Sequence, residues 1–306
     1  MPVYNDSGFL KASVKSILNQ GYKEFEFLII DDGSEDNPEE ILNSFKDSRI
    51  VFKKIPHKGL AGALNYGVSV ANGEFIARID ADDLNTQNRL RLQLDAFEKN
   101  PELDVISSRS VYFNRVNNIL FFIDPPEYDN EIKKFLNLHN PINHSAVIFR
   151  KNKILSHGGY NESFKCYEDF ELWFRLKRKL TFYVLPEYLV YTRLRKNSLT
   201  ATQDKIMIHD LLLNNALRNY DQCSDPKDKE YWNNLLFWIE YFYGNKKKAR
   251  KYPGENFSYK KLIAFLNTYL PEKAFMNIAY SRIRHRIKSK IINKKKYKTE
   301  LKSLAG

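Results

Sequence analysis

Apolar positions follow two alternating periodicities along the first two hundred residues. Apolar residues three or four apart predict helices, and short continuous apolar runs predict buried strands. The expected helices lie near residues 10–18, 41–45, 60–71 and 90–97, and the expected strands at 25–30, 49–55, 75–79 and 105–113. Strands and helices in regular succession predict an α/β fold with a mainly parallel sheet covered on both faces.

The alternation loosens after about residue 145. A strand is expected at 146–149, a helix at 168–179 and a β-rich segment at 181–193. Beyond residue 204 the pattern is helical, with candidates at 211–217, 231–243 and 259–270. The chain is therefore predicted to divide into an α/β domain, residues 1–204, and a helical C-terminal region, residues 205–306.

The composition is that of a packed globular protein, with 43% hydrophobic and 14% aromatic residues in a chain of 306. Cys166 and Cys223 are too few for a disulfide framework, so a reducing cytoplasm is the expected location. The sequence contains no apolar run of the ~20 residues that span a bilayer, so no transmembrane segment is expected.

Three carboxylates, Asp80, Asp82 and Asp83, directly follow the strand expected at 75–79. Residues two apart on an extended backbone project to the same side, so Asp80 and Asp82 can converge on one hard metal ion carried with a phosphate. The alternative is a solvated loop in which Asp83 caps the following helix.

Two further acidic clusters stand at the ends of predicted elements. Asp32 follows the strand at 25–30, at the carboxyl edge where doubly wound sheets bind ligands, and either contacts a ligand or caps the next helix. Glu168 and Asp169 open a predicted helix, whose dipole keeps a carboxylate ionised. That placement suits either a general base or a cap.

Other chemistries fit the sequence less well. A haloacid dehalogenase-type phosphatase expects Thr or Val where Leu84 stands, and the phosphate-binding glycine motifs are missing. The histidines at positions 57, 139, 144 and 157 have no metal-ligand spacing and are interpreted as structural or surface residues. His144 is the least secure of these interpretations, because it directly precedes an apolar strand.

Six motifs in fixed order carry a resemblance. They are Pro-Val-Tyr-Asn at 2–5, Asp-Asp-Gly-Ser at 31–34, Lys-Gly-Leu-Ala-Gly-Ala-Leu-Asn at 58–65, Asn-Gly-Glu-Phe-Ile-Ala-Arg-Ile-Asp-Ala-Asp-Asp at 72–83, Asn-Arg-Leu at 88–90 and Tyr-Glu-Asp-Phe-Glu-Leu-Trp at 167–173. Over about residues 1–200 the chain resembles the family 2 glycosyltransferases, which have the GT-A fold. Residues 205–306 carry no signal of that family.

The resemblance implies roles for individual residues. Pro2 and Tyr4 would line the nucleobase pocket, Asp32 would accept the uracil N–H, and Lys58 is placed with these donor-binding residues. Asp80 would contact the ribose side of the nucleotide, and Asp82 would ligate Mg²⁺ or Mn²⁺ on the donor diphosphate. Asp169 would deprotonate an acceptor hydroxyl, supported by Glu168 and His144.

The implied reaction transfers a sugar from a nucleotide-sugar, expected to be a UDP-sugar, to a hydroxyl of a saccharide or lipid-linked acceptor. A single base without a nucleophilic carboxylate predicts one displacement with inversion. Two alternatives stay open: a donor-binding but inactive protein, and a metal-dependent phosphoryl-transfer enzyme.

Two departures from the family pattern bear on this expectation. The apolar strand that usually precedes Pro-x-Tyr-Asn is expected to be missing, since Met1 stands directly before Pro2. Many members carry Arg-x-His after the β-rich segment, where this chain has Arg193-Leu194-Arg195. Arginine does not ligate a metal, so Arg193 or Arg195 is predicted to lie near the donor diphosphate.

The basic charge is concentrated at the C-terminal end. Residues 281–306 hold ten Lys/Arg against Glu300, a local net charge of +9 within a total of +12. Ile283, Ile287 and Ile291 recur every four residues among these cations, which predicts a helix on an anionic membrane at the inner face of the cell membrane. The alternative is a terminal helix docked on the domain. Nucleic-acid binding is not expected, because aromatic interleaving is missing.

Overall fold

The computed structural model describes residues 1–116, 118–195, 205–252, 259–269 and 294–305. The strands are β1 (Pro2–Val3), β2 (Phe27–Asp31), β3 (Ile50–Lys54), β4 (Phe75–Ala77), β5 (Leu84–Asn85), β6 (Val105–Arg115), β7 (Asn118–Ile123), β8 (Ile148–Arg150) and β9 (Phe182–Arg193). The helices are α1 (Ser7–Leu18), α2 (Pro38–Asn43), α3 (Leu60–Val70), α4 (Arg89–Lys99), α5 (Asp129–Leu136), the 3₁₀ turn η1 (His144–Ala146), α6 (Lys151–Leu155), α7 (Glu168–Leu176), α9 (Ile206–Gln222), α10 (Pro226–Phe242), α11 (Lys246–Ala249), α12 (Tyr259–Asn267) and α14 (Lys294–Ala305).

The strands form two sheets of different character. The first is parallel, in the order β1-β2-β3. The second has the order β4-β8-β6-β9-β5, with β7 paired to β6, and only its β6–β9 pair is parallel among the pairs described. The prediction of a mainly parallel sheet is therefore wrong for this second sheet. Apolar runs mark strands but not their direction, and the short β6–β7 connection permits only an antiparallel hairpin.

A two-residue strand forms within the Pro-x-Tyr-Asn motif itself, after the position of the strand that was expected to be missing. Pro2 and Val3 form β1, which pairs in parallel with Ile30 and Asp31 at the edge of the first sheet. The backbone N–H of Asp32 donates to the carbonyl of Val3 at 2.9 Å, and Val3 is buried. Two residues are thus enough to set the start of the chain against the carboxyl end of β2.

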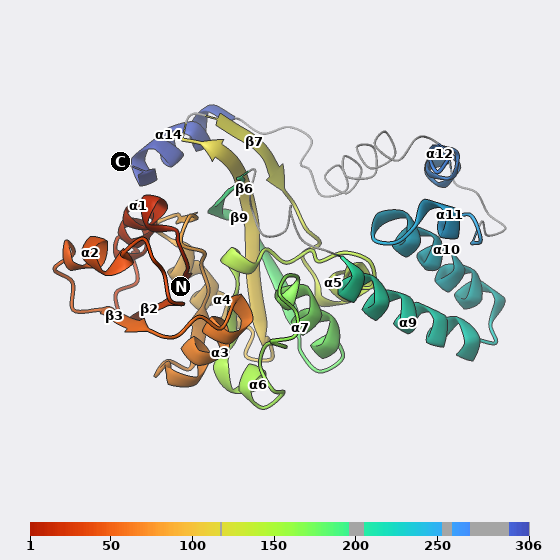
Figure 1. The fold of residues 1–306 in the computed structure, drawn as a ribbon, viewed down its shortest axis with the longest axis horizontal. Helices are drawn as coiled ribbons and strands as arrows, with labels where there is room; N and C mark the ends of the chain where they lie inside the picture. The colour runs from red at the N-terminus through yellow and green to blue at the C-terminus, as the bar shows by residue number, and fades with distance from the viewer. Residues whose placement is uncertain (117, 196–204, 253–258, 270–293, 306) are drawn as a thin grey trace.

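The largest apolar core joins the second sheet to the C-terminal helices. Trp173 of α7 packs with Phe149 and Phe182 of the sheet, and Leu212 of α9 and Phe237 of α10 belong to the same buried cluster. Figure 1 shows α9, α10, α11 and α12 gathered at one end of the molecule. The helices predicted beyond residue 204 are thereby confirmed, while the proposed domain division stays a prediction.

The last helix, α14, returns to the opposite end of the molecule. Figure 1 places it beside α1 and β7, away from α9 to α12. Leu301 is fully buried with Leu84 and Val111 of the second sheet, and the hydroxyl of Tyr191 donates to Glu300 at 2.6 Å. The described end of the basic tail, α14, therefore docks on the second sheet.

The isoleucine pattern at 283, 287 and 291 lies outside the described residues, so the membrane prediction for that stretch stays a prediction. Within the described ranges, no helix combines the length and apolarity that crossing a membrane requires.

Candidate active site

Asp32 follows β2 and holds the loop that leads into α3. Its Oδ1 accepts a hydrogen bond from the backbone N–H of Lys58 at 2.7 Å, and its Oδ2 accepts from Gly59 at 2.9 Å. The Nδ1 of His57 lies 2.9 Å from the same buried carboxylate. The predicted residues Asp32 and Lys58 therefore meet, but through the lysine backbone rather than its side chain.

Tyr4 and His57 form a stacked aromatic pair beside Asp32. Their ring centroids are 4.3 Å apart and their planes differ by 27°. Tyr4 is 46% exposed, so this pair presents a flat surface to solvent next to a buried carboxylate. The sequence analysis interpreted His57 as a structural or surface residue. Its position directly before the Lys58-Gly59 motif was the signal that could have indicated a place in the site.

The turn after β2 is tied to the start of the chain. The Oγ of Ser34 accepts from the backbone N–H of Asn5 at 3.1 Å, and the N–H of Ser34 donates to Asp31 at 2.8 Å. Gly33 has a φ of 79°, which favours glycine and makes this turn possible. Pro2 and Tyr4 are therefore held at the carboxyl end of β2, beside Asp32.

Asp80 is bound by a buried arginine from its own strand end. Arg78 donates to both carboxylate oxygens at 2.6 and 2.5 Å, and the Oγ of Ser145 lies 2.9 Å from Oδ2. Burial alone would raise the pKa of Asp80, but Arg78 outweighs it and holds that pKa below its usual value. Asp80 is thus an ionised carboxylate at neutral pH, and Arg78 is a partner that sequence reasoning missed.

Asp82 lies opposite the arginines at the end of β9. Nε of Arg195 is 2.8 Å from its carboxylate, and Arg195 also pairs with Asp6. Burial, with a further contribution from Asp80, raises the pKa of Asp82 to about 6. Nε of Arg193 donates to the backbone carbonyl of Asp82 at 3.1 Å. Both arginines of the Arg193-Leu194-Arg195 motif, which differs from the family pattern, therefore contact Asp82.

Asp83 does not cap a helix. Strand β5 follows it directly, and α4 begins only at Arg89, so the helix-cap interpretation of this residue is wrong. The carboxylate of Asp83 is buried and accepts from the backbone N–H of Arg193 at 2.7 Å. Burial and the neighbouring Asp82 raise its pKa well above its ordinary value. The hydrogen bond from Arg193 joins the acidic run at 80–83 to β9.

Asp169 sits in the first turn of α7, which follows a left-handed residue, Tyr167, with a φ of 62°. Its Oδ1 accepts from the backbone N–H of Phe170 at 2.7 Å, and its Oδ2 accepts from Nδ2 of Asn140 at 2.7 Å. Burial raises the pKa of Asp169 to about 6, against the lowering effect of His144. A carboxyl group with that pKa titrates in the range that a general base needs near neutral pH.

His144 is buried between Tyr160 and Glu168. Its Nε2 lies 2.9 Å from the Tyr160 hydroxyl, and its Nδ1 lies 3.5 Å from Glu168. Burial lowers the pKa of His144 to about 3 and raises the pKa of Tyr160, so the imidazole is neutral and the phenol protonated at neutral pH. In the tautomer with the imidazole proton on Nδ1, facing Glu168, the tyrosine hydroxyl donates to Nε2.

One segment, residues 140–145, connects the two acidic centres. Asn140 at its start donates to Asp169, and Ser145 at its end contacts both Arg78 and Asp80. Between them, Asn143 donates to Thr192 of β9 at 2.7 Å. The predicted donor-side and acceptor-side carboxylates are therefore fixed relative to each other by a single stretch of backbone.

Two groups of side chains offer ligand atoms for a cation. Asp82 offers a hard carboxylate oxygen that already faces a cation, the Arg195 guanidinium. Its raised pKa indicates that a further positive charge nearby would stabilise its ionised form. His144, Glu168 and Asp169 also place one ligand atom each within 4.8 Å of one another. Of the two groups, Asp82 is the one that lies beside the guanidinium groups of Arg193 and Arg195, which suit a diphosphate.

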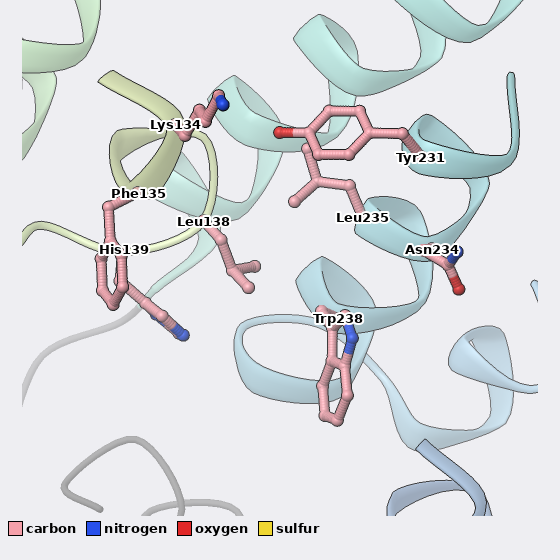
Figure 2. Close-up of a pocket in the computed structure, with 8 residues that line it drawn as sticks. All are labelled: Lys134, Phe135, Leu138, His139, Tyr231, Asn234, Leu235 and Trp238. Carbon is pink, nitrogen blue, oxygen red and sulfur yellow. The ribbon is translucent and has the colours of Figure 1, made fainter. Parts of the chain in front are cut away.

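A groove of about 250 Å³ lies between the end of α5 and α10 (Figure 2). It is lined by Lys134, Phe135, Leu138, His139, Tyr231, Asn234, Leu235 and Trp238. None of the site residues named in the sequence analysis lines this groove. It is separate from the acidic centres, although His139 directly precedes Asn140.

Comparison with known sequences agrees with this geometry. The profile of the family described as Glycosyl transferase family 2 matches residues 1–155. An uncharacterised glycosyltransferase of Methanocaldococcus jannaschii is 31% identical over 253 residues, covering 79% of this chain and 84% of the relative. The UDP-Gal:alpha-D-GlcNAc-diphosphoundecaprenol beta-1,3-galactosyltransferase of Escherichia coli is 32% identical over 173 residues, covering 55% of this chain and 62% of that enzyme.

Solved structures agree at the level of the fold. Residues 1–349 of Staphylococcus aureus TarS in complex with UDP-GlcNAc superpose with a TM-score of 0.61 at 16% identity, over 89% of this chain and 81% of TarS. The mannosyltransferase PcManGT of Pyrobaculum calidifontis, in complex with GDP-Man and Mn²⁺, gives a TM-score of 0.56 at 14% identity, over 91% and 82%.

The parallel β1-β2-β3 sheet, the mixed second sheet and the acidic run between them are therefore those of a GT-A glycosyltransferase. The profile match covers half of the chain, and the archaeal relative covers more than two thirds of it. The chain belongs to glycosyltransferase family 2.

Proposed function

We propose that this enzyme transfers a sugar from a UDP-sugar to a hydroxyl of a saccharide or lipid-linked acceptor, by a metal-assisted single displacement with inversion. The observation that carries the proposal is the link through residues 140–145 between Asp80 on one side and Asp169 on the other. A direct displacement needs a leaving group and a base on opposite faces of one sugar, held at a fixed separation.

The donor would bind along the carboxyl ends of β2 and β4. The exposed Tyr4–His57 pair offers a flat surface for a nucleobase. Asp32 beside it has a buried carboxylate already engaged by loop 57–59, so uracil recognition requires either a remaining lone pair or a shift of that loop. Asp80, which keeps its negative charge next to Arg78, would accept hydrogen bonds from the ribose hydroxyls.

Asp82 would hold Mg²⁺ or Mn²⁺ against the donor diphosphate. A divalent cation there would offset the negative charge that builds on the departing nucleoside diphosphate. Arg193 and Arg195 lie next to Asp82 and supply permanent positive charge where a diphosphate would lie. The crystallised neighbour with Mn²⁺ supports this choice of ion only by likeness of fold.

Asp169 would take the proton of the attacking hydroxyl. It is the carboxylate whose pKa stands near 6 in the first turn of α7, and Glu168 beside it faces the neutral His144. The intact Glu168-Asp169 pair favours glycosyl transfer over phosphoryl transfer, because a phosphoryl-transfer reaction has no need of it. An inactive role has no support, because β1 is formed and the acidic centres are joined.

The acceptor class rests on relatives and on charge. The similar Escherichia coli enzyme is named for a lipid-linked acceptor, alpha-D-GlcNAc-diphosphoundecaprenol. A basic stretch at 281–306 suits attraction to an anionic membrane surface, each cation contributing about 1 kcal/mol. Replacing Ile283, Ile287 and Ile291 with serine leaves α14 intact, and it should reduce flotation with phosphatidylglycerol liposomes. Unchanged flotation would remove the membrane part of the proposal.

Donor binding tests the proposal directly. Titration calorimetry with UDP-GlcNAc, UDP-galactose and GDP-mannose, each with and without Mn²⁺, should show Mn²⁺-dependent binding of a UDP-sugar. Asp82→Asn should weaken that binding about tenfold or more, because one ligand charge is lost. Asp95→Asn on the exposed face of α4 is the matched control and should bind normally. No binding of any nucleotide-sugar would defeat the proposal.

A further inference from the structure

The carboxylate of Asp169 is oriented by two donors of different origin. One is the backbone N–H of Phe170 in the same helical turn, which reaches Oδ1 at 2.7 Å. The other is Nδ2 of Asn140, which reaches Oδ2 at 2.7 Å from 29 residues earlier in the chain. The backbone donor cannot by itself fix the rotation of the carboxyl group, because it holds only one oxygen.

The orientation of the Asn140 amide is set by its own loop. Its Oδ1 accepts from the backbone N–H of Ile142 at 3.0 Å, an arrangement of the Asx-turn type. With the amide oxygen occupied there, the NH₂ group must face Asp169. A donor in that place satisfies the ionised Asp169 carboxylate, which an apolar or acidic neighbour would leave without a hydrogen bond.

We infer that Asn140 is a positioning residue for the base, holding the Asp169 carboxylate ionised and turned toward the acceptor. This inference rests on the proposed function, because it takes Asp169 to be the base. An ionised carboxylate oxygen has two lone pairs, so Oδ2 can accept from Asn140 and still take the proton of an attacking hydroxyl. No change of hydrogen-bond partner is then needed during the reaction.

Charged and titratable groups near Asp169 act on its ionisation without fixing its orientation. They are Arg78, which favours the ionised form, and Tyr112, His144, Tyr160 and Glu168. Glu168 opposes ionisation of Asp169, and His144 has a pKa lowered to about 3, so it carries no charge at neutral pH. The side-chain amide of Asn140 donates directly to the Asp169 carboxylate and so orients it.

The loop of Asn140 also connects Asp169 to the donor side of the site. Asn140 and Ser145 stand at the two ends of the segment that contacts Asp169 and Asp80. Asn140 therefore sets the base relative to the donor side and not only relative to α7. Its loss should lower turnover while leaving the affinity for the donor unchanged.

Carbon-13 NMR of protein labelled at the aspartate carboxyl carbon measures the pKa of Asp169 without any substrate, and Asp169→Asn assigns the signal. We expect Asn140→Ala to raise that pKa by about one unit, since a hydrogen bond to the charged form is lost. The isosteric Asn140→Asp should raise it further, through a second negative charge. The matched control Asn137→Ala, three residues earlier in the chain, should leave the signal unmoved.

Release of UDP from UDP-galactose or UDP-GlcNAc with Mn²⁺ gives the second measurement. Both Asn140 variants should lower kcat tenfold or more with an unchanged KM for the donor, and should shift the acidic limb of the profile to higher pH. An unmoved Asp169 pKa in both variants would overturn the inference. Full turnover by Asp169→Asn would instead overturn the proposed function, so the two failures are distinguishable.

Discussion

The Nε of Arg195 lies 2.8 Å from the carboxylate of Asp82, the residue expected to ligate the donor's metal ion. The family pattern that the sequence resembles has Arg-x-His here, with the histidine where Arg195 stands, and a histidine can ligate a metal directly. A guanidinium cannot, so its positive charge must act on the carboxylate and the diphosphate instead. In the proposed function, the donor, the cation and the protein would meet at this pair.

Arg195→Ala should weaken donor binding and slow turnover. A hydrogen bond to a charged group contributes about 1.5–3 kcal/mol, which corresponds to roughly ten- to hundredfold in KM or kcat. Steady-state kinetics of UDP release would measure it. Arg91→Ala, which removes a surface arginine paired with Asp95, is the control and should change neither constant. Unchanged constants for Arg195→Ala would show that the arginine does not touch the diphosphate.

Arg78→Met should destabilise the fold by about 1–3 kcal/mol, because it leaves Asp80 without its paired charge and Asp80 is partly exposed to screening water. Arg78 holds the folded-state pKa of Asp80 below its usual value. That stabilisation is present above the unfolded pKa and is lost as pH falls through the folded pKa. Urea unfolding at pH 7 and pH 3.5 should show the difference between variant and parent shrinking at the lower pH.

Turnover should fall as pH drops through about 6, with a slope of one proton. Burial raises the pKa of Asp169 to about 6, so the base becomes protonated, and therefore inactive, below that pH. The pKa of Asp82 also stands at about 6 in the free protein, but a bound cation would lower it. Saturating Mn²⁺ therefore isolates the Asp169 limb, and a limb near pH 4 would contradict this assignment.

Leu301→Ala should destabilise the protein by about 2–4 kcal/mol, because a fully buried leucine in α14 would leave a cavity against the second sheet. Leu304, which is only partly buried in the same cluster, is the control, and Leu304→Ala should cost less than half as much. Thermal unfolding measures both. Equal, small effects would mean that α14 does not dock on the sheet in solution.

The sequence was most informative where local pattern decides structure. Strand ends carry polar side chains, so Asp32 and Asp80–Asp83 could be placed at the edge of a sheet from the apolar runs alone. The wrong cap at Asp83 came from the same local reasoning, because a two-residue strand, β5, leaves no periodic signal.

Partners far apart in the chain could not be predicted in this way. Arg78 and Ser145 meet across 67 positions, Asn140 and Asp169 across 29, and Tyr191 and Glu300 across 109. Periodicity records the face that a side chain occupies and not the element that packs against it. The antiparallel pairs of the second sheet and the return of α14 belong to this class.

Glycosyl transfer by single displacement, with Asp169 as the base, can be tested on the sugar that the enzyme releases. Proton NMR of UDP-galactose with Mn²⁺, followed in time, reports the anomer that is first released to water in place of the acceptor. We expect the parent enzyme to release β-galactose from the α-linked donor. We expect Asp169→Asn to bind the donor normally but to release no sugar. First release of α-galactose, or undiminished release by Asp169→Asn, would contradict this mechanism.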